Sequence, residues 1–441
     1  METEEKKEIR QIKAKRNPIQ TVCVPGSKSI TNRALLLAVM GSGKSTLRGC
    51  LFSEDSRHFL QCVQDLGFET RVDEAAATIE VTGLGGCLPV RKGSVYVGSA
   101  GTAARFLAAY LACNQGEFLM DASEQMRRRP MEPLIEALRS VGAEIECTQN
   151  PGHFPLVVKG HGILTDHVTV DIDQSSQFLS ALLIAAPLAE RGLTIDVSGS
   201  HGMAYIDMTV KMMEQFGVSV SRVGKKRFVV FGGQGYRALD YPVEPDVSAA
   251  CYFWALAAIH GISVTVPGIH AGTSQNGSLQ GDVAFASLLA RMGCQVTEEA
   301  QGVRVTGPAD GVLKGVSVDM RSFSDQAITL AAIAPFADSP VEMTGIGHIR
   351  RQESDRLSAM AKNLRAMGIQ VEEREDSIRI EPGLPKAAVI ETCEDHRLAM
   401  GFALTGTRAE GIVIQNPGCC KKTFEQYFDV LEQVTKAIEG R

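Results

Sequence analysis

Apolar residues recur along this chain in two helical patterns. In the first, they lie on one face of a helix and end at an apolar residue followed by glycine. These glycines stand 75 or 76 residues apart: Gly67, Gly142, Gly217, Gly293 and Gly368. Such a one-sided pattern predicts a helix on the surface of a core, ended by a glycine cap. A short alternating stretch follows each glycine, as in 143–146, and predicts a strand.

The second pattern is apolar on nearly every side, which predicts buried helices. Six stretches show it: 35–39, 106–112, 178–188, 249–259, 328–337 and 398–404. Each follows a polar turn, and successive turns are 71 to 77 residues apart. The chain is therefore predicted to be α/β and to contain six repeats, the last ending without its strands. Repeats this long and this few do not suit a solenoid, so we expect two domains of three repeats each.

A proline-punctuated link after the third repeat, Tyr241-Pro242-Val243-Glu244-Pro245-Asp246, marks the domain boundary. The first domain is predicted to span 26–243. The second is predicted to be discontinuous, from 1–25 and 244–441, because the segment before Pro25 can supply the strand that the sixth repeat lacks.

Composition favours a globular enzyme that acts on small anions. The chain has 441 residues, 45 Lys and Arg against 51 Asp and Glu, and eleven scattered cysteines. Its acidic balance argues against nucleic acid, and its basic clusters are short and local. No apolar run reaches the length of a membrane span, and the first sixteen residues do not form a secretion signal. Without a cysteine framework, reduced thiols and a cytoplasmic location are expected.

The stretch Pro25-Gly26-Ser27-Lys28-Ser29-Ile30-Thr31-Asn32-Arg33 runs directly into the first buried helix. Ser29 and Arg33 are four residues apart and share a helix face. Lys28 stands beside them at the helix N-terminus, where free N–H groups favour an anion. This stretch predicts a cradle for a phosphate or a carboxylate; an ordinary capped helix with solvated charges is the simpler alternative.

These nine residues resemble the N-terminal signature of the enolpyruvyl transferase family, in the branch that forms 5-enolpyruvylshikimate-3-phosphate. Later motifs match that family in the same order over nearly the whole chain: the loop 97–105, Arg129-Pro130, Asp173–Phe178, the segment 347–356, Asp395-His396-Arg397 and Lys421-Lys422. The resemblance implies two domains, each of three βαβαββ units around buried helices. It also implies transfer of the enolpyruvyl group of phosphoenolpyruvate to the 5-hydroxyl of shikimate-3-phosphate, with release of phosphate.

The resemblance assigns residues to each substrate. Phosphoenolpyruvate is expected to contact Lys28, Ser99, Gly101, Arg129, Gln177, Arg356, Arg397 and Lys422. Shikimate-3-phosphate is expected to contact Lys28, Ser29, Arg33, Ser175, Ser176, Gln177, Asp325, His348 and Gln352. Asp325, Glu353 and Lys28 are expected to carry protons, and His396 to lie behind the ligand-binding residues.

Four positions depart from the family pattern. Ser99 stands where Asn is common, His348 where the family has Asn, and Gln352 where it has Lys. Gly202 replaces a Ser that contacts the phosphate, although Ser200 is close in sequence. Arg129 is expected at a helix start, because Pro130 suits the first helical position, whereas Arg127 and Arg128 are expected on the surface.

Two alternatives remain open. The sister enzyme of the same fold transfers enolpyruvate to a UDP-sugar, but its hallmark Cys is absent from 123–126. A nucleotide-binding module could use Gly41-Ser42-Gly43-Lys44-Ser45-Thr46, but position 38 is Ala where the phosphate-loop pattern needs Gly.

The expected cations replace any metal or cofactor, and the partners are the two small substrates alone. A monomer is expected. Because the candidate residues divide between the two domains, we also expect an open ligand-free form that closes around its substrates.

Overall fold

The computed structural model describes residues 5–13, 19–199, 202–272 and 277–440. The chain divides into two compact units at 25/26 and at 243/244. We call 26–243 the continuous unit, and the residues up to 25 together with those from 244 the discontinuous unit. No described helix combines the length and the apolar character needed to cross a membrane.

The continuous unit contains three four-stranded sheets. In the order of their strands across each sheet, they are β14 (Asp240–Pro242), β3 (Ser42–Arg48), β5 (Thr78–Leu84) and β4 (Thr70–Asp73); β6 (Lys92–Tyr96), β7 (Gln115–Asp121), β9 (Leu156–His161) and β8 (Glu144–Cys147); and β10 (His167–Asp171), β11 (Gly192–Ser198), β13 (Arg227–Phe231) and β12 (Ser221–Val223). In each, one parallel pair is followed by antiparallel pairs.

The discontinuous unit repeats this plan twice and ends with a three-stranded sheet. Its sheets are β2 (Ile19–Thr21), β15 (Ser263–Pro267), β17 (Gly302–Thr306) and β16 (Gln295–Glu299); β18 (Val316–Asp319), β19 (Val341–Thr344), β21 (Ser377–Ile380) and β20 (Val371–Glu373); and β22 (Ala388–Ile390), β23 (Ile412–Gln415) and β1 (Lys6–Ile9).

Strand exchange explains why the chain crosses between the units. β14, at the end of the third repeat, pairs with β3 of the first repeat, so the continuous unit completes its own first sheet. β2 pairs instead with β15 of the fourth repeat, and β1 pairs antiparallel with β23 of the sixth. The segment before Pro25 thus supplies the strand that the sixth repeat lacks.

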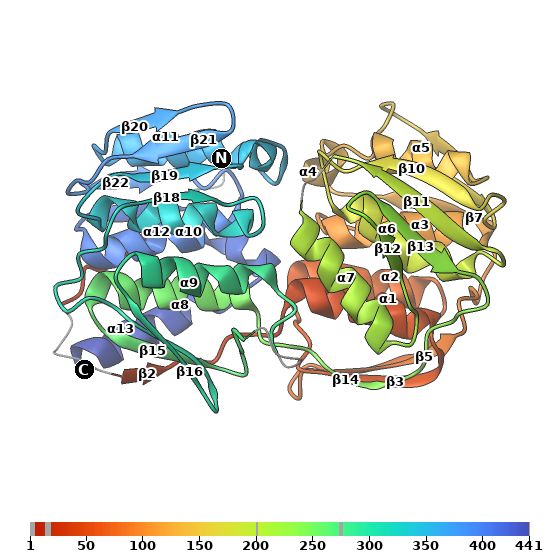
Figure 1. Ribbon diagram of the computed structural model, residues 1–441, viewed down its shortest axis with the longest axis horizontal. Coiled ribbons are helices and arrows are strands. Elements are labelled where there is room, and N and C mark those ends of the chain that lie inside the picture. Colours follow the sequence, from red (N-terminus) through yellow and green to blue (C-terminus); the bar gives the residue numbers. More distant parts are fainter. Residues whose placement is uncertain (1–4, 14–18, 200–201, 273–276, 441) are drawn as a thin grey trace. The chain divides into compact units, whose positions relative to one another are not determined.

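Each predicted apolar stretch falls in a buried helix. These helices are α1 (Lys28–Met40), α3 (Gly101–Ala112) and α6 (Gln177–Ala185, extended by the 3-10 helix η1, Ala186–Leu188), with α8 (Val247–His260), α10 (Ala327–Ile333, extended by η4, Ala334–Phe336) and α12 (His396–Arg408). In Figure 1, α8, α10 and α12 run through the interior of the discontinuous unit, between the sheet of β18 and β19 and the sheet of β15 and β16. Their long apolar side chains are almost entirely buried, because these helices form the core.

The surface helices are α2 (Glu54–Asp65), α5 (Glu132–Ser140), α7 (Met203–Gln215), α9 (Ala284–Arg291), α11 (Arg356–Ala366) and α13 (Tyr427–Glu439), with a single turn at α4 (Glu124–Arg127). The five predicted glycines follow α2, α5, α7, α9 and α11, and all have positive φ. Glycine is favoured there because it adopts the left-handed conformation without strain.

The phosphate-loop-like run 41–46 does not precede a helix. It enters strand β3, and Lys44 Nζ pairs with Glu80 Oε2 at 2.9 Å on the surface. The nucleotide-binding alternative therefore loses the strand–loop–helix geometry on which it depends.

Candidate active site

The buried helices of the continuous unit begin at candidate residues. Lys28 and Ser29 open α1, Gly101 opens α3 and Gln177 opens α6. Among the described residues, none of the three N-cap side chains accepts a hydrogen bond from its own helix. Because the first N–H groups of a helix need acceptors, such starts suit an anion.

In the discontinuous unit, carboxylate side chains cap two of the three buried helices. Asp246 caps α8 by accepting from the Ala249 N–H at 2.9 Å, and Asp395 caps α12 by accepting from the Arg397 N–H at 3.0 Å. These two N-termini already hold a carboxylate. An anion bound in this unit would therefore depend more on side-chain cations than on helix N–H groups.

Lys28 and Arg33 lie in different surroundings on α1. Lys28 Nζ donates to Asp55 Oδ2 at 3.1 Å, and Asp55 is 2% exposed. Arg33 is 1% exposed, and its guanidinium donates to Thr209 Oγ1 at 2.8 Å and to the Ser29 carbonyl oxygen at 3.1 Å. Burial lowers the pKa of Arg33 to about 10, so the side chain stays charged at neutral pH.

Arg129 lies over the start of α3. A Cβ atom built on Gly101 would lie 3.0 Å from Arg129 Nη1, so a side chain at 101 would press on the guanidinium. The expectation that Pro130 opens a helix is wrong, because α5 begins at Glu132 and Pro130 lies in the link after α4. The Arg129 guanidinium thus lies beside the backbone at Gly101, while its residue belongs to a link and not to a helix start.

The neighbouring side chains on this link behave as surface groups. Arg127 pairs with Asp121 at 2.8 Å, and Arg128 pairs with Glu124. Ser99 Oγ lies 2.6 Å from Ser123 Oγ, which ties the glycine-rich loop to the start of α4.

Ser175, Ser176 and Gln177 form the turn into α6. Ser175 Oγ accepts from the Gln177 N–H at 3.3 Å, and Ser176 is 4% exposed. Gln177 Oε1 is buried without a hydrogen-bond partner among the described residues. A buried amide oxygen in that state is costly unless a ligand or water satisfies it.

Gly202, at the N-cap of α7, packs against this turn. Its φ is +66°, and a Cβ atom there would lie 2.5 Å from Ser176 Oγ. A side chain at position 202, such as the serine of the family pattern, would therefore require Ser176 to shift. Ser200 lies outside the described residues.

Arg356 is the centre of an ion-pair network in the discontinuous unit. The guanidinium donates to Asp395 Oδ2 at 2.7 Å, to Glu353 Oε2 at 2.8 Å and to Asp325 Oδ1 at 3.1 Å. A further bond reaches Gln352 Oε1. Burial alone would lower the pKa of Arg356, but the carboxylates of Asp395, Glu353 and Asp325 raise it above its ordinary value.

Two further cations complete the network. Arg397 Nη2 donates to Asp325 Oδ2 at 2.8 Å, and Lys422 Nζ lies 3.5 Å from Glu353 Oε1. Lys422 is 5% exposed at the end of the 3-10 helix η6 (Pro417–Lys422), while its neighbour Lys421 is exposed. Both carboxylates predicted to move protons therefore contact two cations each.

His348 lies on η5 (Gly347–Arg351), beside the turn that carries Asp325. Its Nε2 lies 2.8 Å from Ser324 Oγ. Burial lowers the pKa of His348 to about 4, against the opposing effect of Asp325 and with a smaller contribution from Arg356. The ring is therefore neutral at neutral pH. His396, 2% exposed, opens α12 beside Asp395.

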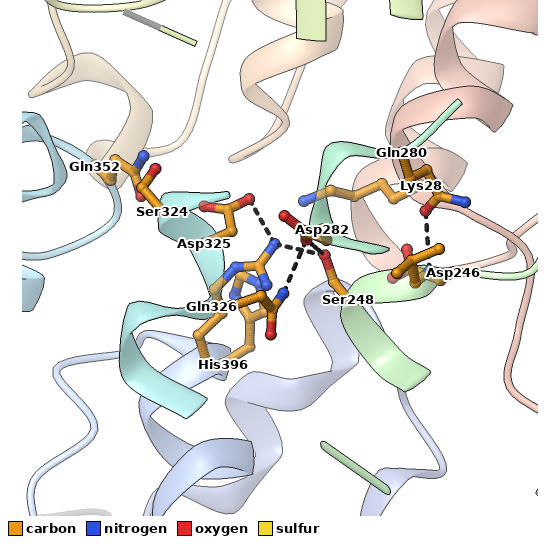
Figure 2. A network of polar contacts seen from close by, with 12 residues as sticks. Lys28, Asp246, Ser248, Gln280, Asp282, Ser324, Asp325, Gln326, Gln352 and His396 are labelled. Carbon is orange, nitrogen blue, oxygen red and sulfur yellow. Dashed lines mark hydrogen bonds and ion pairs between the residues drawn. The ribbon is translucent and has the colours of Figure 1, made fainter. Parts of the chain in front are cut away.

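The sequence pattern missed two residues that touch this network. Ser248, on the first turn of α8, lies with its Oγ 3.5 Å from Arg397 Nη2. Asp282, on the 3-10 helix η2 (Gly281–Val283), accepts from Ser248 Oγ and from Gln326 Nε2, the latter at 2.8 Å. Figure 2 shows Ser248, Asp282, Asp325 and Gln326 in this arrangement. Ser248 lies in one of the polar turns before the apolar stretches and carries no chemical motif, and neither does a single Asp in 281–283.

Comparison with known proteins shows the family of this chain. The family model for EPSP synthase (3-phosphoshikimate 1-carboxyvinyltransferase) matches residues 13–431. A 3-phosphoshikimate 1-carboxyvinyltransferase of Trichormus variabilis is 44% identical over 409 residues, 92% of this chain and 94% of that protein. One from Vibrio atlanticus is 40% identical over 426 residues, 95% of this chain and 98% of that protein.

Solved structures give the same fold. An EPSP synthase from Acinetobacter baumannii superposes with a TM-score of 0.81 at 26% identity, covering 98% of both chains. The enolpyruvyl transferase NikO from Streptomyces tendae reaches a TM-score of 0.72 at 16% identity, which supports the fold alone. The prediction of a two-domain enolpyruvyl transferase fold is confirmed. The chain belongs to the EPSP synthase family, the 3-phosphoshikimate 1-carboxyvinyltransferases.

Proposed function

We propose that this enzyme transfers the enolpyruvyl group of phosphoenolpyruvate to the 5-hydroxyl of shikimate-3-phosphate and releases phosphate. Membership of the family supports the reaction. The observation that carries it here is the network in which Arg356, Arg397 and Lys422 surround Asp325 and Glu353. It combines cations for phosphate and carboxylate groups with two carboxylates for proton transfer.

Shikimate-3-phosphate would be bound by residues of both units. In the continuous unit, the hydroxyl and amide groups of Ser29, Ser175, Ser176 and Gln177 suit a phosphate and a polyhydroxylated ring, with Lys28 and Arg33 as cations. In the discontinuous unit, Asp325, His348 and Gln352 would contact the acceptor. The buried oxygen of Gln177, which has no partner within the described structure, would gain one from a substrate hydroxyl.

Phosphoenolpyruvate would be bound by a second set of groups. Arg356, Arg397 and Lys422 would take its anionic groups in the discontinuous unit. Lys28, Arg129 and Gln177, with the backbone at Ser99 and Gly101, would contribute from the continuous unit. The position of Arg129 beside Gly101 supports this grouping, because it places a guanidinium near an uncapped helix start.

The reaction needs two proton movements. Asp325 would take the proton of the acceptor hydroxyl as its oxygen adds to C2 of phosphoenolpyruvate. Lys28 and Glu353 would deliver a proton to the methylene carbon and then remove one from it as phosphate leaves. The surrounding cations stabilise the negative charge of the tetrahedral intermediate, so the residues themselves supply the electrostatic stabilisation.

Phosphate release tests this proposal against its alternative. With phosphoenolpyruvate as donor, we expect release in the presence of shikimate-3-phosphate and none with UDP-N-acetylglucosamine. Release with only the UDP-sugar would contradict the proposal. We further propose a cytoplasmic location, in keeping with eleven free cysteines. We also propose that the enzyme is a monomer, and light scattering of the purified protein would measure its mass.

A further inference from the structure

Two elements of the discontinuous unit bring polar groups to a buried carboxylate on a third element. Asp282 is 5% exposed and lies on η2. Ser248, from the start of α8, and Gln326, from η3 (Ser324–Gln326), both donate to its Oδ2. The same short turn carries Asp325, which binds Arg397 from the start of α12. Figure 2 shows Asp282 among these groups.

The direction of each hydrogen bond in this cluster follows from the chemistry of the groups. Thr329 Oγ1 donates to Gln326 Oε1 at 3.0 Å, so the Gln326 amide presents its Nε2 to Asp282. An ionised carboxylate only accepts, so Ser248 must use its single proton on Asp282. The remaining lone pairs of Ser248 Oγ then face Arg397, which only donates.

Arg397 thus has two oxygen acceptors on one nitrogen. Its Nη2 donates to Asp325 Oδ2 at 2.8 Å and lies 3.5 Å from Ser248 Oγ. Two N–H bonds on that nitrogen can serve both oxygens, which fixes the plane of the guanidinium. Without Ser248, this nitrogen would lose one of the two oxygen atoms that orient it.

We propose that Asp282 is a positioning residue for Arg397, acting through the Ser248 hydroxyl. The carboxylate holds the hydroxyl so that its oxygen faces Nη2, and thereby presents the guanidinium to phosphoenolpyruvate. The inference rests on the proposed function, because Arg397 is assigned there to that substrate. A purely structural Asp282 would instead only tie η2 to α8 and to η3.

The surroundings of Asp282 disfavour its negative charge, but only in part. Burial and the nearby Asp325 raise the pKa of Asp282 to about 6, while Arg397 and the two hydrogen bonds oppose that rise. The group is therefore ionised at pH 8, where it accepts from both donors. A buried carboxylate is otherwise costly, which fits a role for its charge.

The test compares Ser248→Ala and Asp282→Asn with Ser263→Ala in the full-length enzyme at pH 8. Ser248→Ala removes the link and keeps the carboxylate, whereas Asp282→Asn keeps the shape and removes the charge. Ser263 is a matched control, because its half-buried hydroxyl also makes one bond, 2.8 Å to Thr306 Oγ1 on the sheet of β15 and β17. The measurements are kcat, the two KM values and the thermal midpoint.

We expect KM for phosphoenolpyruvate to rise about tenfold in both test variants, the effect of losing one hydrogen bond to a charged group. KM for shikimate-3-phosphate should stay within about twofold, and Ser263→Ala should match wild type. Because both residues act along one path, the double variant should be no worse than the more severe single variant.

Other outcomes separate the inference from the function. A fall in kcat with both KM values unchanged, or an equal rise in both, would indicate a structural role and overturn the inference. If Asp282→Asn does not fold, Ser248→Ala alone decides the matter by the same KM split. A wild-type enzyme without turnover would overturn the proposed function itself, and the inference with it.

Discussion

Arg356 shows how much of the site chemistry is concentrated in single residues. It is 2% exposed, yet its guanidinium contacts three carboxylates, two of which are assigned to substrate chemistry. Removing a carboxylate leaves the buried charge of Arg356 less compensated, so replacements that keep the shape of the side chain are the gentlest probes. Asparagine and glutamine keep the shape and replace one carboxylate oxygen by an NH2 group, so the side chain can no longer act as a base.

We expect Asp325→Asn and Glu353→Gln each to lower kcat by about 10²–10⁴-fold, the usual contribution of a general acid or base. KM for either substrate should change much less. Asp319→Asn is the control, because Asp319 also binds an arginine, Arg321, but on an exposed strand end. Steady-state kinetics check this; normal kcat in both test variants would show that the proton-transfer assignments are wrong.

His348 gives the site a defined response to acid. Its pKa is about 4 in the folded protein against 6.5 ordinarily, so between these values only the unfolded chain binds a proton there. The free energy of unfolding should therefore fall as the pH drops below about 6.5, by about 1.4 kcal/mol per pH unit for one such group. Its contribution is fully present above that range.

His348→Asn should reduce this loss of stability, because it removes one of the groups that titrate only in the unfolded state. Urea unfolding at about pH 7 and about pH 5 measures the difference. His260 keeps a similar depressed pKa, about 4, in the variant, so part of the acid sensitivity should remain. An unchanged difference between the two pH values would contradict the neutral state of His348.

At the scale of elements, the start of α7 and the turn into α6 are built against each other. Gly202 leaves room for Ser176 by having no side chain. Gly224 offers a matched position, because its φ of +65° equals that of Gly202 within a degree and a Cβ atom there meets nothing within 4 Å. The two glycines therefore separate backbone strain from crowding.

Gly224→Ala should cost about 1–2 kcal/mol of stability, the penalty of a side chain in the left-handed region, without changing the kinetics. Gly202→Ala should cost more, and it should raise KM for shikimate-3-phosphate by displacing Ser176. Denaturant unfolding and steady-state kinetics on both variants check this. Equal stability losses and equal KM values would mean that Ser176 moves aside freely or does not bind that substrate.

Elements differ in how far their sequence predicts them. The buried helices and the glycine-capped surface helices were predictable, since both have strong periodic patterns and a common physical cause in burial. The exchange of β2 and β14 between sheets was not, because three-residue strands such as 19–21 and 240–242 carry no periodicity. Asp282 and Ser248 were missed for a similar reason: their importance comes from neighbours 34 residues apart and from Arg397.

At the scale of the whole molecule, the residues proposed to bind each substrate come from both units. The chain crosses between the units at 25/26 and at 243/244. A ligand bound by both units draws them together by the free energy of its contacts. We therefore expect the radius of gyration in solution scattering to fall when shikimate-3-phosphate is added with a phosphoenolpyruvate analogue. Inorganic phosphate alone is the control, and an unchanged radius with the full pair would contradict closure.

The pairing of β1 with β23 also means that β1 is synthesised long before the strand with which it pairs. Lys6 pairs with Gln415, so a ribosome makes one strand about 400 residues before its partner. At about 5–20 residues per second, the first strand waits on the order of 20–80 s for the second. An unpaired strand can pair with another chain and cause aggregation, and charged side chains on the strand suppress this pairing. The sequence of β1 is Lys-Lys-Glu-Ile, and only Ile9 becomes buried in the folded protein. The strand can therefore remain solvated in the nascent chain until its partner is translated.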